Sequence, residues 1–127
     1  MTNNNIYKSR KWVKPEDLNA NSTLFGGKLL AWIDEEAALF AVLILKNRRV
    51  VTKYMTEINF MSSARQSDII EIQFEITKFG KTSLQIKCSV FNIMTKESII
   101  TVEAITMVHL GEDGKPTPHG LTDLGWF

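Results

Sequence analysis

Residues 19–38 contain two features that could do chemistry, a glycine pair and an aspartate. Gly26 and Gly27 stand where a long apolar segment with high helix propensity begins. The first amides of a helix lack partners inside it and carry partial positive charge, and glycine lets a ligand approach them closely. Such amides can stabilise a carbonyl oxygen that gains negative charge during a reaction. The alternative is that the two glycines only permit a tight turn from loop to helix.

Asp34 lies well inside the expected helix, where aspartate has a poor helix propensity and gains nothing from the helix dipole. On a helical wheel its neighbours are apolar and mostly small, namely Leu30, Ala37, Ala38 and Ala41. A carboxylate on such a face is costly to bury unless it is paired, which makes Asp34 a candidate functional group. The alternative is a buried polar anchor that is hydrogen-bonded to a sheet. Glu35 falls on the polar side of the wheel and is expected in solvent, and Glu36 is intermediate.

The other candidate groups are interpreted more simply as structural. His109 and His119 lie far from this segment in the sequence and are expected to be surface or hydrogen-bonded histidines. Cys88 belongs to the apolar side of a predicted strand and is expected in the core. No histidines and cysteines have the spacing of a metal site, so no metal is expected. The turn Gly80-Lys81-Thr82-Ser83 is first a hairpin connection, although its polar side chains could also contact a ligand.

One long helix over residues 27–46 is the clearest element, because the segment is rich in Leu, Ala and Glu and has no proline or internal glycine. Its narrow polar side carries Lys28, Glu35 and Lys46, so the helix is expected to be covered nearly all round. Strands are predicted at residues 6–13, 49–61, 68–79, 82–94 and 98–110. In two of them apolar and polar residues alternate cleanly, which is typical of antiparallel strands with one buried face.

These elements predict an α+β fold in a single domain, residues 1–127, with a polar C-terminal tail over about residues 111–127. The connections at residues 80–81 and 95–97 are short enough for hairpins, and we expect the last four strands to form a meander. A five-stranded antiparallel sheet curled around one long central helix satisfies the pattern. One helix cannot cover both faces or both edges of such a sheet, so a dimer or a larger assembly is expected.

Composition and charge exclude several classes of protein. The chain has 15 basic and 14 acidic residues, and a formal net charge of +1 predicts no strong attraction to nucleic acid or to an anionic membrane. No apolar run approaches the roughly 18 residues of a membrane span, so no membrane insertion is expected. The polar first residues show no secretory signal. The single cysteine cannot form an internal disulfide, which favours a reducing, cytoplasmic setting.

The run LFGGKLLAWIDEEAA, residues 24–38, resembles the hot-dog-fold acyl-CoA thioesterases. The similarity is to the branch that contains the bacterial acyl-CoA thioesterases and the brain-type acyl-CoA hydrolases. Further matching motifs are Arg49-Val50-Val51-Thr52, Ile58-Asn59-Phe60, Gly80-Lys81-Thr82-Ser83 and Asp113-Gly114-Lys115-Pro116. Together these motifs extend the resemblance over nearly the whole chain.

The resemblance implies hydrolysis of a fatty-acyl-CoA thioester to a free fatty acid and CoA. It implies no metal and no separate cofactor, since CoA is part of the substrate. Asp34 corresponds to the family's catalytic aspartate, which acts as general base on water or as nucleophile on the thioester carbonyl. The amide of Gly27, with that of Gly26, corresponds to the oxyanion donor. In the family the two halves of a site come from different subunits of a homodimer, and further assembly into a tetramer or hexamer is expected.

Other positions are carried over as substrate contacts. They are Phe25, Gly26, Asn59, Arg65, Gly80, Lys81, Thr82 and Ser83. The adenine nucleotide end of CoA is expected near a basic side chain such as Lys81 or Arg65. Many relatives carry Asn or Asp three residues before the glycine pair, where this chain has Thr23, and Asn21 matches another frequent family position. Both are therefore kept as candidate catalytic residues that orient water or the carbonyl.

Two other functions compete with hydrolysis. Hydration or dehydration of acyl thioesters on the same fold normally needs a histidine beside a carboxylate, and residues 19–46 contain none. A non-catalytic acyl-CoA-binding sensor would use the same cleft. It would have to act through a partner protein, because the chain has no basic recognition helix for DNA. Release of free thiol from acyl-CoAs separates the enzyme from the sensor.

Overall fold

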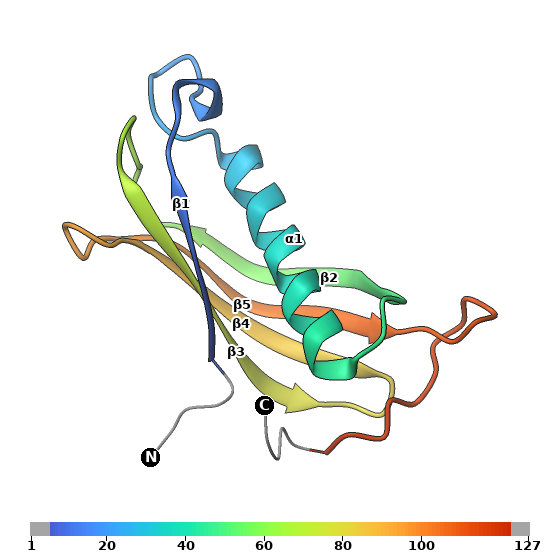
Figure 1. Cartoon of the computed structure of the whole chain (residues 1–127). Coiled ribbons are helices and arrows are strands. Elements are labelled where there is room, and N and C mark those ends of the chain that lie inside the picture. The colour runs from blue at the N-terminus through green and yellow to red at the C-terminus, as the bar shows by residue number, and fades with distance from the viewer. Residues whose placement is uncertain (1–5, 123–127) are drawn as a thin grey trace.

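The computed structural model describes residues 6–122, which form five strands, one long helix and one helical turn. The elements are β1 (Ile6–Trp12), η1 (Pro15–Asp17), α1 (Gly26–Leu45), β2 (Val50–Phe60), β3 (Ile69–Phe79), β4 (Ser83–Asn92) and β5 (Ser98–His109). The sheet is curved, and α1 lies across its concave face (Figure 1). The predicted α+β architecture, with one helix packed on a five-stranded antiparallel sheet, is confirmed. No helix among residues 6–122 is both long and apolar enough to cross a membrane.

The strand order is β1-β3-β4-β5-β2, and every neighbouring pair is antiparallel. The predicted β3–β4 and β4–β5 hairpins are confirmed, but the predicted meander of four strands is wrong for β2. This strand pairs with β5 at one edge of the sheet, and the chain then crosses to the other side, where β3 lies between β1 and β4. The crossing segment is hydrogen-bonded at both ends: the Met61 amide donates to the Ile99 carbonyl of β5, and the Val13 amide, just after β1, donates to the Asp68 carbonyl. Alternation predicts a strand but does not select its distant partner.

The core lies between α1 and the concave face of the sheet. The buried apolar residues of the helix recur at spacings of three and four and are Leu29, Ile33, Ala37, Phe40, Ala41 and Ile44. Phe40 stacks on Tyr7 of β1 at a ring-centroid distance of 5.2 Å. The opposite side of α1 is open within one chain, since Leu39 is 46% and Leu43 is 51% exposed. The expectation that the helix is covered nearly all round is therefore not met by a single chain.

Among residues 6–122 three carboxylates are buried, and each is paired. Glu36, on the covered side of α1, accepts a hydrogen bond from the Tyr7 hydroxyl at 3.3 Å and pairs with Lys11 at 3.3 Å, so it ties β1 to the helix. Burial, followed by the Glu36 charge, raises the pKa of Tyr7. Glu71 accepts hydrogen bonds from Gln73 at 2.6 Å and Arg10 at 3.0 Å, and these bonds lower its pKa. The third, Asp17, belongs to the site described below.

Cys88 points into the core from β4 and is completely buried, as the alternation of its strand predicts. Burial raises the pKa of its thiol to about 12, so the reactive thiolate is scarce at neutral pH. We expect a chromogenic aromatic disulfide reagent to leave the native protein unlabelled and to react with one thiol per chain in guanidinium chloride. Rapid labelling of the native protein at neutral pH would contradict the packing of β4 described here.

Candidate active site

The loop before α1 is organised by Asn19, which sequence reasoning did not select. The Asn19 Oδ1 atom accepts hydrogen bonds from the Asn21 amide at 2.9 Å and from the Thr23 amide and hydroxyl, each at 3.2 Å. The Asn19 amide in turn donates to the Thr23 carbonyl at 2.7 Å. Asn21 and Thr23, the two residues predicted here, are thus held by Asn19. The signal available in the sequence was an Asn followed by small and mostly polar residues, a pattern that favours side-chain-capped turns.

Asp17 fastens this loop to the first turn of α1 and was also not predicted. Its carboxylate is 2% exposed, accepts a hydrogen bond from the Lys14 amide at 2.9 Å and lies 3.5 Å from the Lys28 ammonium group. Its carbonyl oxygen accepts a hydrogen bond from the Phe25 amide at 2.9 Å. Asp17 therefore contacts both the residue before the loop, Lys14, and the start of α1, Phe25 and Lys28, and these contacts fix where the helix begins.

The first amides of α1 are unpartnered. The first bond of the helix runs from the Leu29 amide to the Phe25 carbonyl at 3.1 Å. Among residues 6–122, the amides of Gly26, Gly27 and Lys28 have no acceptor, as expected at a helix start. A Cβ atom on Gly27 would lie 2.8 Å from the Phe25 ring, so the absence of a side chain leaves room for that ring. A Cβ atom on Gly26 would likewise lie 3.2 Å from the ring of Phe60, at the end of β2.

Asp34 lies on the open side of α1, where it faces the edge strand β2. Its side chain is exposed, and its Oδ1 atom accepts a hydrogen bond from the Thr52 hydroxyl at 2.6 Å. The predicted alternative was a buried polar anchor that is hydrogen-bonded to the sheet. The hydrogen bond to the sheet is present, but the prediction of burial is wrong, because the carboxylate is exposed to solvent. Thr52 belongs to a motif noted in the sequence, yet no local pattern predicted its contact with Asp34.

One chain does not bring Asp34 and Gly27 to the same point. They are seven positions apart in a straight helix, so they lie on one face at a separation of about 10 Å along the axis, given a rise of about 1.5 Å per residue. A reacting group must lie about 3 Å from both a base and an oxyanion donor. A site built around Asp34 therefore needs an oxyanion donor other than the Gly27 amide of the same helix, and a site built around Gly27 needs a base other than the Asp34 of that helix.

The remaining predicted contact residues are spread over the molecule. Arg65 pairs with Thr23 in an isolated bridge and therefore lies beside the loop before α1. Asn59 is exposed and, by the alternation of β2, points to the opposite face from Phe60. The turn Gly80–Ser83 joins β3 to β4 at the far end of the sheet, near the C-terminal end of α1 (Figure 1). Within one chain this turn is remote from Gly26 and Gly27.

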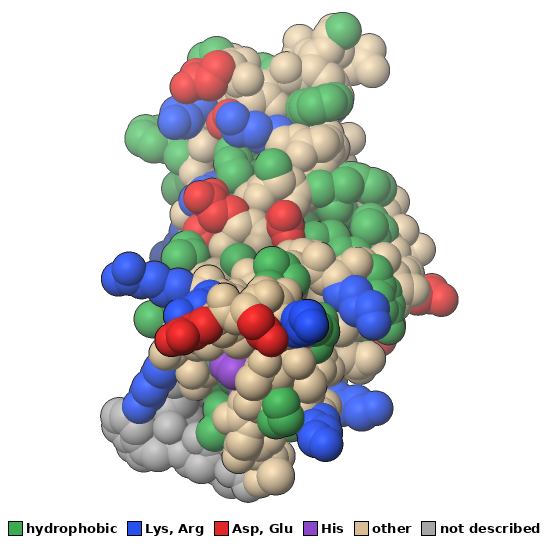
Figure 2. Space-filling model, turned by 90° about the vertical axis from the view of Figure 1, so that its right-hand side faces the viewer, with side chains coloured by type: hydrophobic (Ala, Val, Ile, Leu, Met, Phe, Trp, Pro, Cys, Tyr) green, Lys and Arg blue, Asp and Glu red, His purple; other side chains and the backbone are tan. Residues whose placement is uncertain are grey.

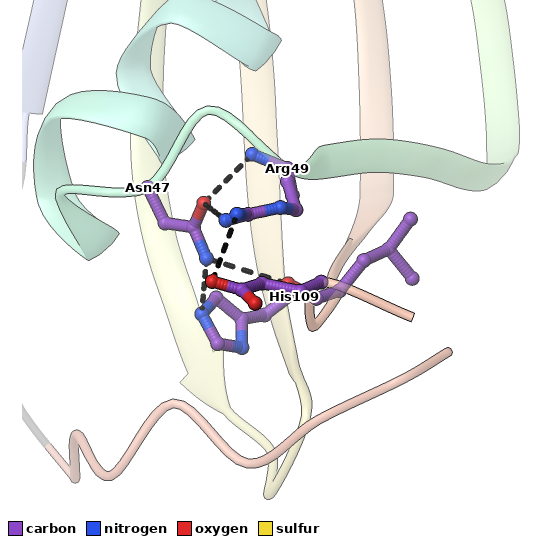
Figure 3. A network of polar contacts seen from close by, with 5 residues as sticks. Asn47, Arg49 and His109 are labelled. Carbon is purple, nitrogen blue, oxygen red and sulfur yellow. Dashed lines mark hydrogen bonds and ion pairs between the residues drawn. The ribbon is translucent and has the colours of Figure 1, made fainter. Parts of the chain in front are cut away.

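Both histidines are hydrogen-bonded structural residues, as predicted. Asn47, just after α1, donates to the His109 Nε2 atom at 2.9 Å and accepts from the Arg49 amide at 2.9 Å (Figure 3). The other ring nitrogen of His109 lies 2.7 Å from the Thr117 carbonyl, and His119 lies 2.9 Å from that of Ser83. Among residues 6–122, no group of three or more His, Cys, Asp and Glu side chains is placed to hold a metal ion.

Hydrophobic side chains remain exposed along α1, β2 and the adjoining loops. They include Phe25, Leu39, Leu43, Val51, Tyr54, Ile58, Phe60 and Met61. On the side of the molecule drawn in Figure 2 such side chains gather into a patch bordered by charged residues. An exposed apolar surface of this kind, next to the unpaired edge of β2, is typical of a contact with another protein surface.

Comparisons with known proteins found a matching family model and similar sequences. The family model described as "Thioesterase superfamily" matches residues 21–99. YkhA of Bacillus subtilis, named an uncharacterized acyl-CoA thioester hydrolase, is 33% identical over 109 residues. That match covers 84% of this chain and 63% of the relative, so the chain spans less than two thirds of the relative's length.

Two solved structures have the same fold. An acyl-CoA hydrolase from Staphylococcus aureus, solved in complex with butyryl coenzyme A, gives a TM-score of 0.80 at 26% identity. The match covers 91% of this chain and 69% of that one. An apo-hexameric acyl-CoA thioesterase gives a TM-score of 0.78 at 38% identity, over 91% of this chain and 75% of the other.

Proposed function

The chain belongs to the thioesterase superfamily and has its hot-dog fold, and from this premise we propose that it hydrolyses acyl-CoA thioesters to a free acid and CoA. One observation carries the proposal: the exposed Asp34 carboxylate, held by Thr52, lies on a helix whose first amides have no acceptor among residues 6–122. A thioester is already activated, so a base and an oxyanion donor placed on one carbonyl are sufficient for its hydrolysis.

In the proposed mechanism, the carbonyl oxygen of the thioester accepts a hydrogen bond from the Gly27 amide, with Gly26 beside it. Asp34 takes a proton from water as the water oxygen bonds to the carbonyl carbon, and the π electrons of the carbonyl move onto the oxygen that the amides hold. The carbonyl then re-forms as the carbon–sulfur bond breaks, and the protonated Asp34 gives its proton to the departing sulfur of CoA. In the alternative form the Asp34 carboxylate attacks the carbonyl carbon, the carbon–sulfur bond breaks and CoA leaves as its thiolate. Water then hydrolyses the resulting mixed anhydride, which frees the acid and Asp34 and releases the proton that the thiolate takes up. Thr52 occupies one carboxylate oxygen in either case and leaves the other free to react.

We further propose that each site is shared by two chains. The separation of about 10 Å between Asp34 and Gly27 in one chain supports a site made from Asp34 of one chain and the helix start of another. The exposed apolar side chains of α1 and β2, with the free edge of β2, supply a surface for this contact. A homodimer is the smallest assembly in which Asp34 and the helix start of one site come from different chains. Two such dimers would form the expected tetramer, and three would form the expected hexamer.

The CoA part of the substrate is proposed to lie along the boundary between chains. Its nucleotide end would meet Arg65, beside the loop before α1, or Lys81 in the turn between β3 and β4. Since that turn is remote from Gly27 within one chain, Lys81 and its neighbours Gly80, Thr82 and Ser83 would have to come from another chain. No cofactor other than CoA is needed, and the expected cytoplasmic location stays a prediction.

The test is release of free thiol from acetyl-, butyryl-, octanoyl-, dodecanoyl- and palmitoyl-CoA by the whole chain. We expect turnover of at least one of these substrates above the rate without protein. Because Cys88 is buried, the thiol reagent reports on CoA alone. Tight binding of acyl-CoA with no turnover at any chain length would contradict the proposal and favour the sensor.

Thr52→Val should lower kcat by roughly 10- to 100-fold, because a hydrogen bond to a charged group contributes about 1.5–3 kcal/mol. Valine keeps the branched shape of threonine and removes only the hydroxyl that bonds Asp34. Thr52→Ser retains that hydroxyl and is the matched control, with kcat expected within a few-fold of the native value. Equal activities of the two variants would show that the bond to Asp34 does not matter for turnover.

A further inference from the structure

Asp17 is a buried residue that the proposed mechanism does not use, and it contacts α1 on both sides of the glycine pair. Its carbonyl oxygen accepts a hydrogen bond from the Phe25 amide at 2.9 Å, and its carboxylate lies 3.5 Å from the Lys28 ammonium group. We propose that Asp17 is a positioning residue, which holds the Gly26 and Gly27 amides in the direction that an oxyanion requires. The inference rests on the proposed function and adds to it the residue that orders its donors.

The start of α1 needs such a hold because its own residues do not supply one. The N-cap position is occupied by Phe25, whose side chain cannot accept a hydrogen bond from the first turn. Ser, Thr, Asp and Asn are preferred there because their side chains can. The next two residues are glycines, which lose more conformational freedom on becoming ordered than any other residue. The order of the donor amides therefore depends on contacts from outside the helix.

Asp17 makes its contacts from a fixed place in the fold. Its side chain is 1% exposed. Its amide donates to the Lys14 carbonyl at 2.9 Å, and its carboxylate accepts a hydrogen bond from the Lys14 amide at 2.9 Å, so the turn η1 is closed on itself. From this turn the Asp17 carbonyl holds the residue before the two glycines, and the carboxylate holds the residue after them. Contacts on both sides limit the rotation of the peptide planes between them.

The charge of Asp17 is the part that an isosteric neutral side chain cannot replace. An asparagine at this position has an oxygen that can still accept the hydrogen bond from the Lys14 amide. It has no charge for the Lys28 ammonium group, so one of the two contacts with the helix start is weakened while the other remains. Misplacement of a reacting group by about 1 Å can cost about 10²-fold in rate. Asp17→Asn therefore isolates the second contact and is expected to affect turnover.

The test measures kcat and KM for the acyl-CoA that the native chain hydrolyses fastest, well below the melting temperature of every variant. Asp17→Asn should lower kcat at least about tenfold, with KM within about threefold of the native value. Lys28→Met, from the more exposed end of the pair, should lower kcat about threefold, and Lys28→Arg should keep it near the native value. Glu16→Gln is the matched control: its side chain is 65% exposed, it removes the same charge one position away, and its kcat should stay within about twofold.

A double substitution separates positioning from a purely structural role. In the Gly27→Pro protein the donor amide is already absent, so adding Asp17→Asn should lower the residual kcat by less than about twofold. A further tenfold loss in that background would overturn the inference, because Asp17 would then act independently of the amide. A native kcat in Asp17→Asn alone would overturn it as well.

A measurement without turnover keeps the inference separate from the proposed function. The NMR order parameters of the Gly26 and Gly27 amides are expected at about 0.85 in the native chain and in Glu16→Gln, and below about 0.6 in Asp17→Asn. Equally rigid amides in all three proteins would contradict the inference. If the native chain hydrolyses no thioester but the order parameters fall as expected, the proposed function fails, and the hold of Asp17 on the helix start stands.

Discussion

Replacing Asp34 with asparagine is expected to lower kcat for thioester hydrolysis by about 10²-fold or more, the scale on which a general base contributes. Asparagine has nearly the same shape, and its side-chain oxygen can still accept the hydrogen bond from Thr52. What it cannot do is take a proton from water or attack a carbonyl. The measurement is thiol release from octanoyl-CoA at saturating substrate, with the melting temperature recorded for both proteins.

Glu35→Gln is the control for this substitution, because Glu35 is an exposed carboxylate next to Asp34 on the same helix. Its removal changes the net charge by the same amount and should leave kcat within about two-fold, as for a solvated surface side chain. An Asp34→Asn protein that retains most of its activity would remove Asp34 from the mechanism.

Gly27→Pro is expected to lower kcat by about 10²- to 10³-fold, the effect of losing one oxyanion donor. Proline has no backbone N–H, and in the first turn of a helix it removes no internal hydrogen bond. The matched control is Gly27→Ala, which keeps the amide. Its Cβ atom meets the Phe25 ring at 2.8 Å, but that ring is 56% exposed and can turn aside. Circular dichroism checks that both variants keep the helix.

The comparison of proline with alanine isolates the amide from the space around it. If both substitutions are equally harmful, the cause is the lost room beside Phe25, and Gly27 is not the oxyanion donor. If neither is harmful, the helix start takes no part in the reaction. Only a large loss in the proline variant with a modest effect in the alanine variant supports the proposed role.

The elements of the fold follow from local patterns in the sequence. The long helix was predicted to within one residue at each end, since a segment rich in good helix formers runs uninterrupted from the glycine pair. Short turns at residues 80–81 and 95–97 correctly predicted two hairpins. The predicted place of β2 in the sheet was wrong, because strand pairing across the sheet depends on the packing of all elements. Alternation along one strand does not indicate which other strand it pairs with.

The site was predictable only in part, for the same reason. Asp34 could be selected because a carboxylate in the middle of an apolar helix conflicts with its local surroundings. Thr52 and Asp17 could not, because a threonine in a strand and an aspartate in a loop conflict with nothing nearby. Their importance appears only where β2 reaches the helix and where the loop closes on itself. Glu36, which looked intermediate on the wheel, is buried because β1 supplies Tyr7 and Lys11 as partners.

The sharing of a site between chains is the central claim, and mixed oligomers test it most directly. Asp34→Asn and Gly27→Pro, each nearly inactive alone, are co-expressed in equal amounts. If every site takes its aspartate from one chain and its amide from another, about a quarter of the sites receive both intact groups by random mixing, and activity returns to about a quarter of the native value. If both groups of a site belong to the same chain, every site carries one of the two substitutions. Activity of the mixture would then stay at the level of the separate variants, and that result would contradict the account.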